Sequence, residues 1–281
     1  MFVDTKKMLQ DATRQGYAVG AFNVENAEMV WAVAAAAEEL RAPVILQTTS
    51  STLRYFTPAM FAAMGRSAAE AASVPIALHL DHGNGFETVR KCVQSGYSSV
   101  MIDGSALGYE DNVAITRQVC EFAAQTGIPV EAELGIVGGK EDDTQADANH
   151  YTDPKQAADF VKRTGVDSLA ISIGTAHGFY AITPVLDLSR ITATRQLVDI
   201  PLVLHGASGV PDETVTQAVK LGMAKVNFAT ELRDAYTKAV RAYLADRPDA
   251  YDPKKYGEAG REAVKQLVMH KIRICMSEGK A

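Results

Sequence analysis

One alternation of short apolar runs and longer helical segments repeats along most of the chain. The eight apolar runs occupy residues 18–24, 43–48, 74–82, 99–103, 128–134, 168–174, 200–205 and 224–230. The segments of helical composition that follow them occupy residues 27–40, 58–72, 86–95, 111–126, 154–164, 189–198, 212–221 and 231–244. Near-continuous apolar runs are typical of parallel strands that are covered on both faces.

Eight strand–helix units in succession predict an α/β fold, the (β/α)8 or TIM barrel. An open doubly wound sheet is the alternative, and the absence of G-x-G-x-x-G after the first run counts against it. We expect one barrel domain over residues 1–281, with residues 247–281 as a C-terminal helical extension. This extension begins with a linker containing proline, and we expect its helix from about Glu258.

Composition narrows the class of protein further. The chain has 281 residues, of which 47% are hydrophobic, and its formal charge is −6. An acidic balance argues against nucleic acid as a partner. No apolar run approaches the ~20 residues that cross a bilayer, and the N-terminus lacks a signal-peptide pattern, so we expect a cytoplasmic protein without membrane contact. The three cysteines, Cys92, Cys120 and Cys275, are widely spaced and indicate buried thiols in a reducing compartment.

Polar side chains gather where the predicted strands end. They are Asn23, Thr48, Thr49, Asp81, His82, Asp103, Glu133, His177, His205, Asn227 and Thr230. Barrel enzymes build their sites at this end of the strands. The pattern therefore predicts a functional site at the barrel mouth.

Three of these residues are histidines at equivalent positions, and each is followed by glycine. They are His82, His177 and His205, at or just past the third, sixth and seventh strands. Three imidazoles that converge would form a zinc site with open positions for substrate, as in catalytic zinc centres. The alternative is three separate histidines with local hydrogen bonds. We interpret His79, which lies on the other side of the third strand from His82, as structural or supporting.

The loops after the seventh and eighth strands indicate an anion site. They read Gly206-Ala207-Ser208-Gly209 and Asn227-Phe228-Ala229-Thr230. Small residues let backbone N–H groups approach a phosphate, and barrels often bind phosphate between these two loops. The long polar loop, residues 135–153, carries Gly138, Gly139 and Glu141 and is typical of a flap with a carboxylate.

Several motifs, taken in chain order, resemble the zinc-dependent, class II ketose-bisphosphate aldolases. They are HLDHG at 79–83, EAELG at 131–135, GGKEDD at 138–143, GTAHG at 174–178, HGASG at 205–209 and NFAT at 227–230. The tagatose-bisphosphate and short fructose-bisphosphate aldolase branch is the most similar. The resemblance covers essentially the whole chain and implies reversible cleavage of a ketose 1-phosphate to dihydroxyacetone phosphate and a three-carbon aldehyde.

The resemblance also implies roles for individual residues. His82, His177 and His205 would bind the catalytic Zn2+, and Asp103 and Glu133 match a second, displaced metal position. Asp81 would carry the proton of the hydroxyl at which cleavage begins. Glu141 would exchange the proton at the dihydroxyacetone carbon, and Asn227 would orient the enediolate.

Substrate-binding residues follow from the same comparison. Gly178, Gly206, Ser208 and Thr230 match a phosphate site, beside which the family often keeps a monovalent cation. Asn23 and Thr49, at the ends of the first two strands, are further candidates for substrate contact. Members that bind a second phosphate commonly do so with a tail residue supplied across a dimer, so we expect a homodimer or homotetramer.

The chain departs from the family pattern at the aldehyde end of the substrate. The tail reads Tyr251-Asp252-Pro253-Lys254 where Asp-Pro-Arg is common, and lysine lacks the bidentate fork of arginine. Arg54 and Lys254 are therefore candidates for binding an anion at C6. That group is a phosphate, as in fructose or tagatose 1,6-bisphosphate, or a sulfonate, as in 6-deoxy-6-sulfofructose 1-phosphate, which would give sulfolactaldehyde.

Three other functions compete with this interpretation. A sugar-phosphate-binding barrel without catalysis is disfavoured because Asp81, Glu141 and the histidines are present. A metal-dependent epimerase or hydrolase is disfavoured by the flap and the phosphate loops. Schiff-base catalysis is disfavoured because Lys225 begins the eighth strand instead of ending it. Stereochemistry at C4, fructose against tagatose, stays open.

Overall fold

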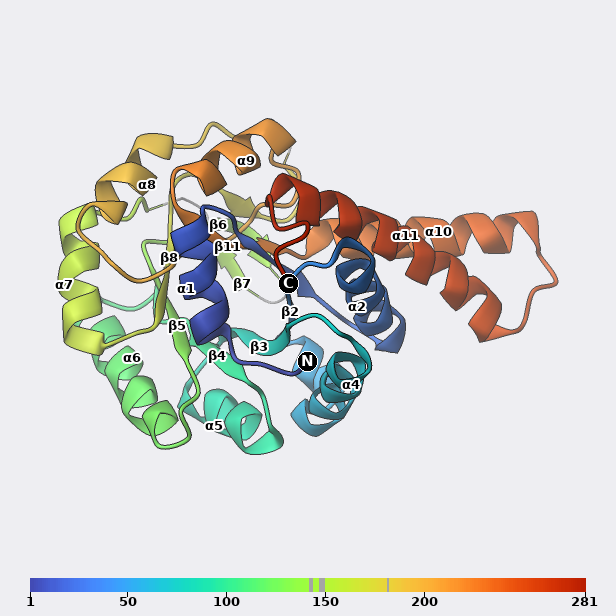
Figure 1. Ribbon diagram of the computed structural model, residues 1–281, viewed down its shortest axis with the longest axis horizontal. Helices are drawn as coiled ribbons and strands as arrows, with labels where there is room; N and C mark the ends of the chain where they lie inside the picture. The colour runs from blue at the N-terminus through green and yellow to red at the C-terminus, as the bar shows by residue number, and fades with distance from the viewer. Residues whose placement is uncertain (142–143, 147–149, 181) are drawn as a thin grey trace.

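Parallel strands form the centre of the molecule (Figure 1). The computed structural model describes residues 1–141, 144–146, 150–180 and 182–281, and the side chains of residues 140, 141 and 144–146 lie outside that description. Within the described chain, eight strands close into a barrel in the order β1-β11-β10-β8-β5-β4-β3-β2. Their bounds are β1 (Val19–Asn23), β2 (Val44–Thr49), β3 (Ile76–Gly83), β4 (Ser99–Ile102), β5 (Val130–Leu134), β8 (Ser168–Ile171), β10 (Leu202–Leu204) and β11 (Met223–Phe228). The predicted TIM barrel is therefore confirmed.

Helices surround the barrel as its outer layer (Figure 1). Those that follow strands are α2 (Ala27–Leu40), α3 (Thr52–Tyr55), α4 (Pro58–Ala71), α5 (Phe86–Ser95), α6 (Tyr109–Ala124), α7 (Pro154–Thr164), α8 (Leu188–Arg195), α9 (Asp212–Lys220) and α10 (Thr230–Asp246). Side chains on β3 illustrate the two layers, because Leu78 and Leu80 pack against the helices while Ala77 belongs to a separate cluster inside the barrel. His79 and Asp81 share the inward face of this strand with Ala77. No helix among the described residues is long and apolar enough to cross a membrane.

Helix α1 (Thr5–Gln15) packs at the opposite end of the barrel from the strand ends that carry the polar residues. The Asp4 side chain caps it by accepting a hydrogen bond from Lys6 N. Met8, Leu9 and Ala12 on its apolar face pack into the same cluster as Ala77 and Ala224, inside the barrel. This helix precedes the first strand, so the repeating strand–helix pattern does not predict it.

The long polar loop after β5 contains regular structure. Strands β6 (Gly138–Glu141) and β7 (Thr144–Ala146) pair antiparallel, and β6 also pairs with β9 (Ala176–His177). Gly139 lies opposite His177 in this small sheet, and a Cβ atom at Gly139 would come within 2.3 Å of the His177 carbonyl oxygen. The small sheet thereby holds the backbone of His177 at the barrel mouth.

The C-terminal extension is a long helix that pairs with α10 to form a hairpin projecting from the barrel (Figure 1). Helix α11 (Pro253–Ile274) begins earlier than the predicted Glu258, because Asp252 accepts a hydrogen bond from Lys254 N and Pro253 follows as the first helical residue. Its C-terminal half packs against the barrel. The Arg261 guanidinium lies 4.0 Å from the centre of the Trp31 ring on α2.

Candidate functional site

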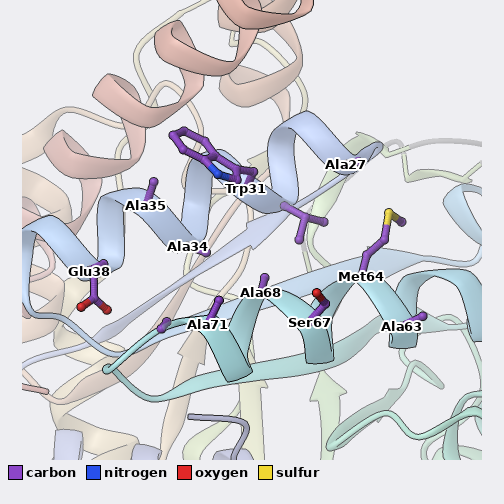
Figure 2. Close-up of a pocket in the computed structure, with 12 residues that line it drawn as sticks. Ala27, Trp31, Ala34, Ala35, Glu38, Ala63, Met64, Ser67, Ala68 and Ala71 are labelled. Carbon is purple, nitrogen blue, oxygen red and sulfur yellow. The ribbon is translucent and has the colours of Figure 1, made fainter. Parts of the chain in front are cut away.

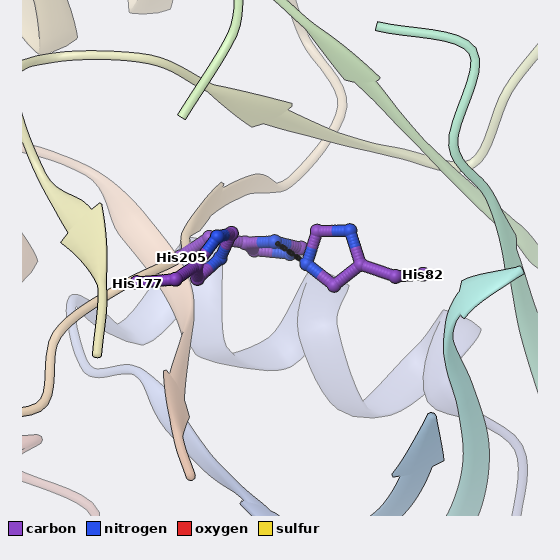
Figure 3. A group of neighbouring side chains, drawn as sticks. All are labelled: His82, His177 and His205. Carbon is purple, nitrogen blue, oxygen red and sulfur yellow. Dashed lines mark hydrogen bonds between the residues drawn. The ribbon is translucent and has the colours of Figure 1, made fainter. Parts of the chain in front are cut away.

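Three histidines from distant parts of the chain meet at the barrel mouth (Figure 3). His82 is the penultimate residue of β3, His177 is the last residue of β9, and His205 directly follows β10. One ligand nitrogen of each ring lies within 4.8 Å of the other two. The ring centres of His82 and His205 are 4.7 Å apart, and those of His82 and His177 are 5.0 Å apart. The structure thus brings together the three residues that sequence spacing picked out.

The rings of His82 and His205 each direct one acceptor nitrogen toward the other ring. His82 Nδ1 lies 2.7 Å from Asp103 Oδ2, and His205 Nε2 lies 2.9 Å from Glu131 Oε1. A neutral ring donates its one N–H to the carboxylate, which leaves His82 Nε2 and His205 Nδ1 as lone-pair atoms. These atoms are 2.9 Å apart. Lone pairs this close are stabilised by a cation or a shared proton, and imidazoles backed by carboxylates are typical divalent-metal ligands, so the donor set fits zinc.

The backbone of His82 makes this convergence possible. Neighbouring side chains on a strand point to opposite sides, so Asp81 and His82 reach one cavity only if the chain turns. Gly83 follows directly and could supply such a turn, but its φ is not positive. The positive φ, +46°, is at His82 itself, a left-handed conformation that non-glycine residues adopt rarely and mostly at functional positions.

Gly83 has a different function. A Cβ atom at this position would lie 2.2 Å from the Met101 carbonyl oxygen on β4. The register between β3 and β4 shifts between Leu80 and Gly83, which is the signature of a bulge. Glycine is required here for close approach of two strands, not for an unusual φ.

Acidic residues adjoin the histidines. His82, Asp103 and Glu133 form a second group whose ligand atoms lie within 4.8 Å of one another. Burial, with the Asp103 charge, raises the pKa of Glu133 to about 7. Burial also opposes ionisation of Asp103, but the hydrogen bond and charge of His82 outweigh it and lower the pKa of Asp103. Glu133 Oε2 accepts no hydrogen bond from the described residues, and it lies 3.4 Å from His205 Nδ1.

Asp81 is held by three side-chain amides. Its carboxylate is 1% exposed, and Asn23 Nδ2 and Gln47 Nε2 donate to Oδ2 at 2.9 and 3.2 Å. Asn227 Nδ2 donates to Oδ1 at 3.0 Å from across the barrel. Asn23 and Asn227 were predicted site residues, whereas Gln47 was not. The sequence does contain a sign of this role, because Gln47 lies two residues before Thr49 and therefore on the same face of β2.

A small cavity lies between the loops that were expected to bind phosphate. Its lining residues are His177, Gly178, Gly206, Ser208, Asn227, Ala229 and Thr230. Gly206 has φ +65°, and a Cβ atom there would come within 2.7 Å of the Ala176 carbonyl oxygen. Thr230 begins α10, so the N-terminal end of a long helix faces this cavity, which favours an anion.

Tyr180, which sequence reasoning missed, connects the loops of this cavity. Its hydroxyl donates to the Gly206 carbonyl oxygen at 2.7 Å and accepts from Ala176 N at 2.6 Å. The ring also lies 3.3 Å from a Cβ atom built at Gly209. One side chain thereby ties the segment carrying His177 to the loop after His205.

Other candidates lie outside this cluster. Lys254 is 85% exposed, pairs with Asp252 and lies in the first turn of α11, where the α10–α11 hairpin reverses direction. Arg54 is exposed at the end of α3, with Nη1 3.5 Å from the Ser50 carbonyl oxygen. Thr49 lies beside Thr52, 3.1 Å between hydroxyl oxygens. The backbone of Glu141 pairs in β6, and its side chain lies outside the described residues.

A groove lined by helices lies away from the histidines, between α2 and α4 (Figure 2). Its volume is about 620 Å³, and alanines form most of its lining. The Glu38 carboxylate at its edge accepts hydrogen bonds from Ser73 N and Oγ at 2.8 and 2.7 Å. This groove contains no convergent polar groups of the kind that the barrel mouth carries.

Comparisons with known proteins agree with this geometry. The family model described as fructose-bisphosphate aldolase class-II matches residues 3–280. The solved YdjI aldolase from Escherichia coli K12 is 40% identical, with a TM-score of 0.90 over 100% of both chains. A putative fructose-1,6-biphosphate aldolase from Coccidioides immitis is 29% identical, with a TM-score of 0.90 over 98% of this chain and 96% of that one.

A more distant structure shares the fold. Fructose-bisphosphate aldolase from Campylobacter jejuni is 22% identical, with a TM-score of 0.81 over 100% of this chain and 97% of that one. Aldolases of this class are generally metal-dependent, which agrees with the histidine cluster. The chain belongs to the class II fructose-bisphosphate aldolase family and is a carbon–carbon lyase.

Proposed function

We propose that this protein catalyses zinc-dependent, reversible aldol cleavage of a ketose 1-phosphate of the fructose- or tagatose-1,6-bisphosphate type. The products are dihydroxyacetone phosphate and a three-carbon aldehyde. The observation that carries the proposal is the meeting of His82, His177 and His205 beside the buried carboxylate of Asp81. Membership of the class II family supports the reaction type.

The three histidines would hold the zinc ion, and Asp103 and Glu133 would hold a metal at a displaced position. A zinc ion bound by neutral imidazoles supplies positive charge that stabilises the negative charge developing on the substrate oxygens. The side chains around it keep the ligands oriented. Asp103 accepts from His82 and Glu131 accepts from His205, at 2.7 and 2.9 Å.

Asp81 removes the proton from the C4 hydroxyl of the ketose. As this proton leaves, the C3–C4 bond breaks, the C4 carbonyl of the aldehyde forms, and the bonding electrons move toward C2. The amides of Asn23, Gln47 and Asn227 hold the Asp81 oxygens in one orientation, so the carboxylate needs little rearrangement. Glu141 delivers a proton to C3 to complete dihydroxyacetone phosphate.

Neighbouring residues bind and orient the substrate. Gly178, Gly206, Ser208 and Thr230 line the cavity for the C1 phosphate, and a monovalent cation beside it offsets the phosphate charge. Asn227 Oδ1 is buried and receives no hydrogen bond within the described structure, so it is available to accept one from a substrate hydroxyl. Asn23 and Thr49, at the ends of β1 and β2, provide further contacts to the substrate.

A second candidate substrate carries a sulfonate at C6. The favouring observation is that Lys254, at the tip of the hairpin, replaces an arginine of the family pattern. In a homodimer or homotetramer the hairpin of one copy would present Lys254 to the mouth of another, where Arg54 would complete the anion site. Turnover of fructose and tagatose 1,6-bisphosphates and of 6-deoxy-6-sulfofructose 1-phosphate distinguishes the substrates. A preference for a bisphosphate by orders of magnitude would exclude the sulfonate.

Metal analysis combined with a cleavage assay tests the reaction itself. Dihydroxyacetone phosphate release is measured before and after thorough treatment with a chelator, and again after zinc is restored. We expect activity to disappear and return with the metal. Activity that survives complete metal removal would refute the proposed mechanism.

A further inference from the structure

A buried ion pair lies inside the barrel beneath the histidines. Lys225 on β11 is 0% exposed, and its Nζ lies 2.9 and 3.1 Å from the two carboxylate oxygens of Glu131 on β5. The Glu131 side chain is 2% exposed, and its Oε1 is also 2.9 Å from His205 Nε2. A continuous chain of contacts therefore runs from Lys225 through Glu131 to a candidate metal ligand.

The ion pair is hard to explain by stability alone. Removing two charges from water carries a large free-energy cost that their attraction often only offsets, and apolar residues of similar size often stabilise a core equally well. The contact with His205 suggests another function. A carboxylate that accepts a hydrogen bond from a metal-binding histidine fixes the tautomer and the orientation of the ring.

Lys225 supplies the positive charge opposite Glu131. The nearby His79 Nε2 is 3.8 Å from Glu131 Oε2, but burial, reinforced by the Lys225 charge, lowers the pKa of His79 well below its usual value. The His79 ring is therefore neutral, and its Nδ1 lies 2.8 Å from Ser99 Oγ. Both Glu131 oxygens contact the ammonium of Lys225, which fixes the plane of the carboxylate.

We propose that Lys225 is a positioning residue for the metal centre that acts through Glu131 on His205. It holds the Glu131 carboxylate so that Oε1 accepts from His205 Nε2 and His205 Nδ1 faces His82. This inference rests on the proposed metal-dependent function. Without Lys225, the Glu131 carboxylate loses the two contacts that fix its plane. Rotation of the carboxylate then moves Oε1 away from His205 Nε2, which releases the His205 ring.

The test measures metal binding rather than turnover. Wild type, Lys225→Met, Glu131→Gln and the double variant are stripped of metal, and Zn2+ affinity is measured by competition with a coloured chelator. We expect each single variant to bind Zn2+ about 10- to 100-fold more weakly. In the Glu131→Gln background, Lys225→Met should change the affinity by less than about threefold, because Lys225 no longer has a carboxylate to hold.

The visible spectrum of the Co2+-loaded proteins is a second readout, since its intensity and band positions depend on ligand geometry. It should change in Lys225→Met and be alike in Glu131→Gln and the double variant. Thr48→Val is the matched control, because it removes another buried hydrogen bond, 2.7 Å to Tyr97, without contact to this network. Its affinity and Co2+ spectrum should equal those of wild type even if its melting temperature falls.

Several results would overturn the inference. One is wild-type affinity in a folded Lys225→Met protein. Another is a full, independent effect of Lys225→Met in both backgrounds, including tighter binding, which would mean that Lys225 acts directly on the ion. If Lys225→Met does not fold, Lys225→Gln replaces it, since glutamine keeps a donor and removes the charge. Failure of the wild type to bind Zn2+ or Co2+ would instead refute the proposed function.

Discussion

Asp81 and His82 are consecutive in the chain, and their side chains reach the same cavity because the φ of His82 is +46°. Asp81 lies on the inward face of β3, and His82 would point away from it in a regular strand. Directly after this turn, Gly83 packs closely against the Met101 carbonyl oxygen on β4. The proposed proton carrier and a proposed metal ligand thereby become neighbours in space as well as in sequence.

Replacement of Gly83 by alanine tests this arrangement. The added Cβ would lie 2.2 Å from Met101 O, so β3 must move away from β4. We expect the free energy of unfolding to fall by about 1–3 kcal/mol and Zn2+ affinity to fall with it, because His82 moves. Chemical denaturation and chelator competition measure the two effects.

The matched control for that variant is Gly108→Ala. Gly108 has φ −60°, and its nearest neighbour to a built Cβ atom is Asp111 Oδ2 at 3.7 Å. Its unfolding free energy should stay within about 0.5 kcal/mol of wild type. A Gly83→Ala protein that matched this control in stability and metal affinity would contradict our account of the bulge.

Asp81→Asn tests the proton carrier. An asparagine amide cannot accept the substrate proton, and its NH2 group would face the donor amides of Asn23 and Gln47 or that of Asn227. We expect kcat to fall about 10²- to 10⁴-fold, with bound zinc unchanged. Steady-state kinetics and metal analysis of the same sample check this. A loss below tenfold would show that another group moves the proton.

Tyr180→Phe tests the connection between the two site loops. The variant loses the hydrogen bonds to Gly206 O and Ala176 N, each worth about 1 kcal/mol. We expect KM to rise about five- to tenfold with a smaller change in kcat, since the proposed phosphate cavity loosens while Asp81 is untouched. Tyr17→Phe, in the apolar cluster that α1 forms at the opposite end of the barrel, is the control and should leave both parameters unchanged. Equal kinetics for the two variants would exclude a role for Tyr180.

Reaction with a thiol reagent tests the state of the cysteines. Cys92, Cys120 and Cys275 are free, and burial raises the pKa of each to about 12. Thiolate is the reactive form, so the native protein should react slowly at pH 8, with a rate that rises about tenfold per pH unit. In denaturant all three should react at once. One fast-reacting thiol in the native protein would contradict this.

The sequence predicts the fold well and the details of the site less well. Apolar runs marked all eight barrel strands because burial on both faces leaves little choice of residue. Helix α1 was missed because it stands before the repeat, and its amphipathic residues, such as Met8 and Leu9, pack inside the barrel instead of on a strand. The predicted start of α11 lies too late because helical composition does not reveal where a capping carboxylate, here Asp252, begins the helix.

Within the site, the residues at strand ends could be predicted from their position in the sequence. The polar residues deeper inside the barrel could not. His82, His177 and His205 follow their strands directly and precede glycine, a visible pattern. Gln47 and Lys225 lie deeper in the barrel, where a polar residue in an apolar strand has no distinctive spacing. Their partners, Asp81 and Glu131, come from other strands and become evident only when the barrel closes.

The hairpin of α10 and α11 affects how the molecule moves as a whole. It places two helices well outside the rounded barrel (Figure 1). Rotational friction rises steeply with the longest dimension of a particle, so an isolated copy would tumble more slowly about the axes across the hairpin than about the axis along it. Fluorescence anisotropy of a dye on the barrel would then decay with more than one correlation time, and the docking of another molecule along the hairpin would be visible as a change in that decay.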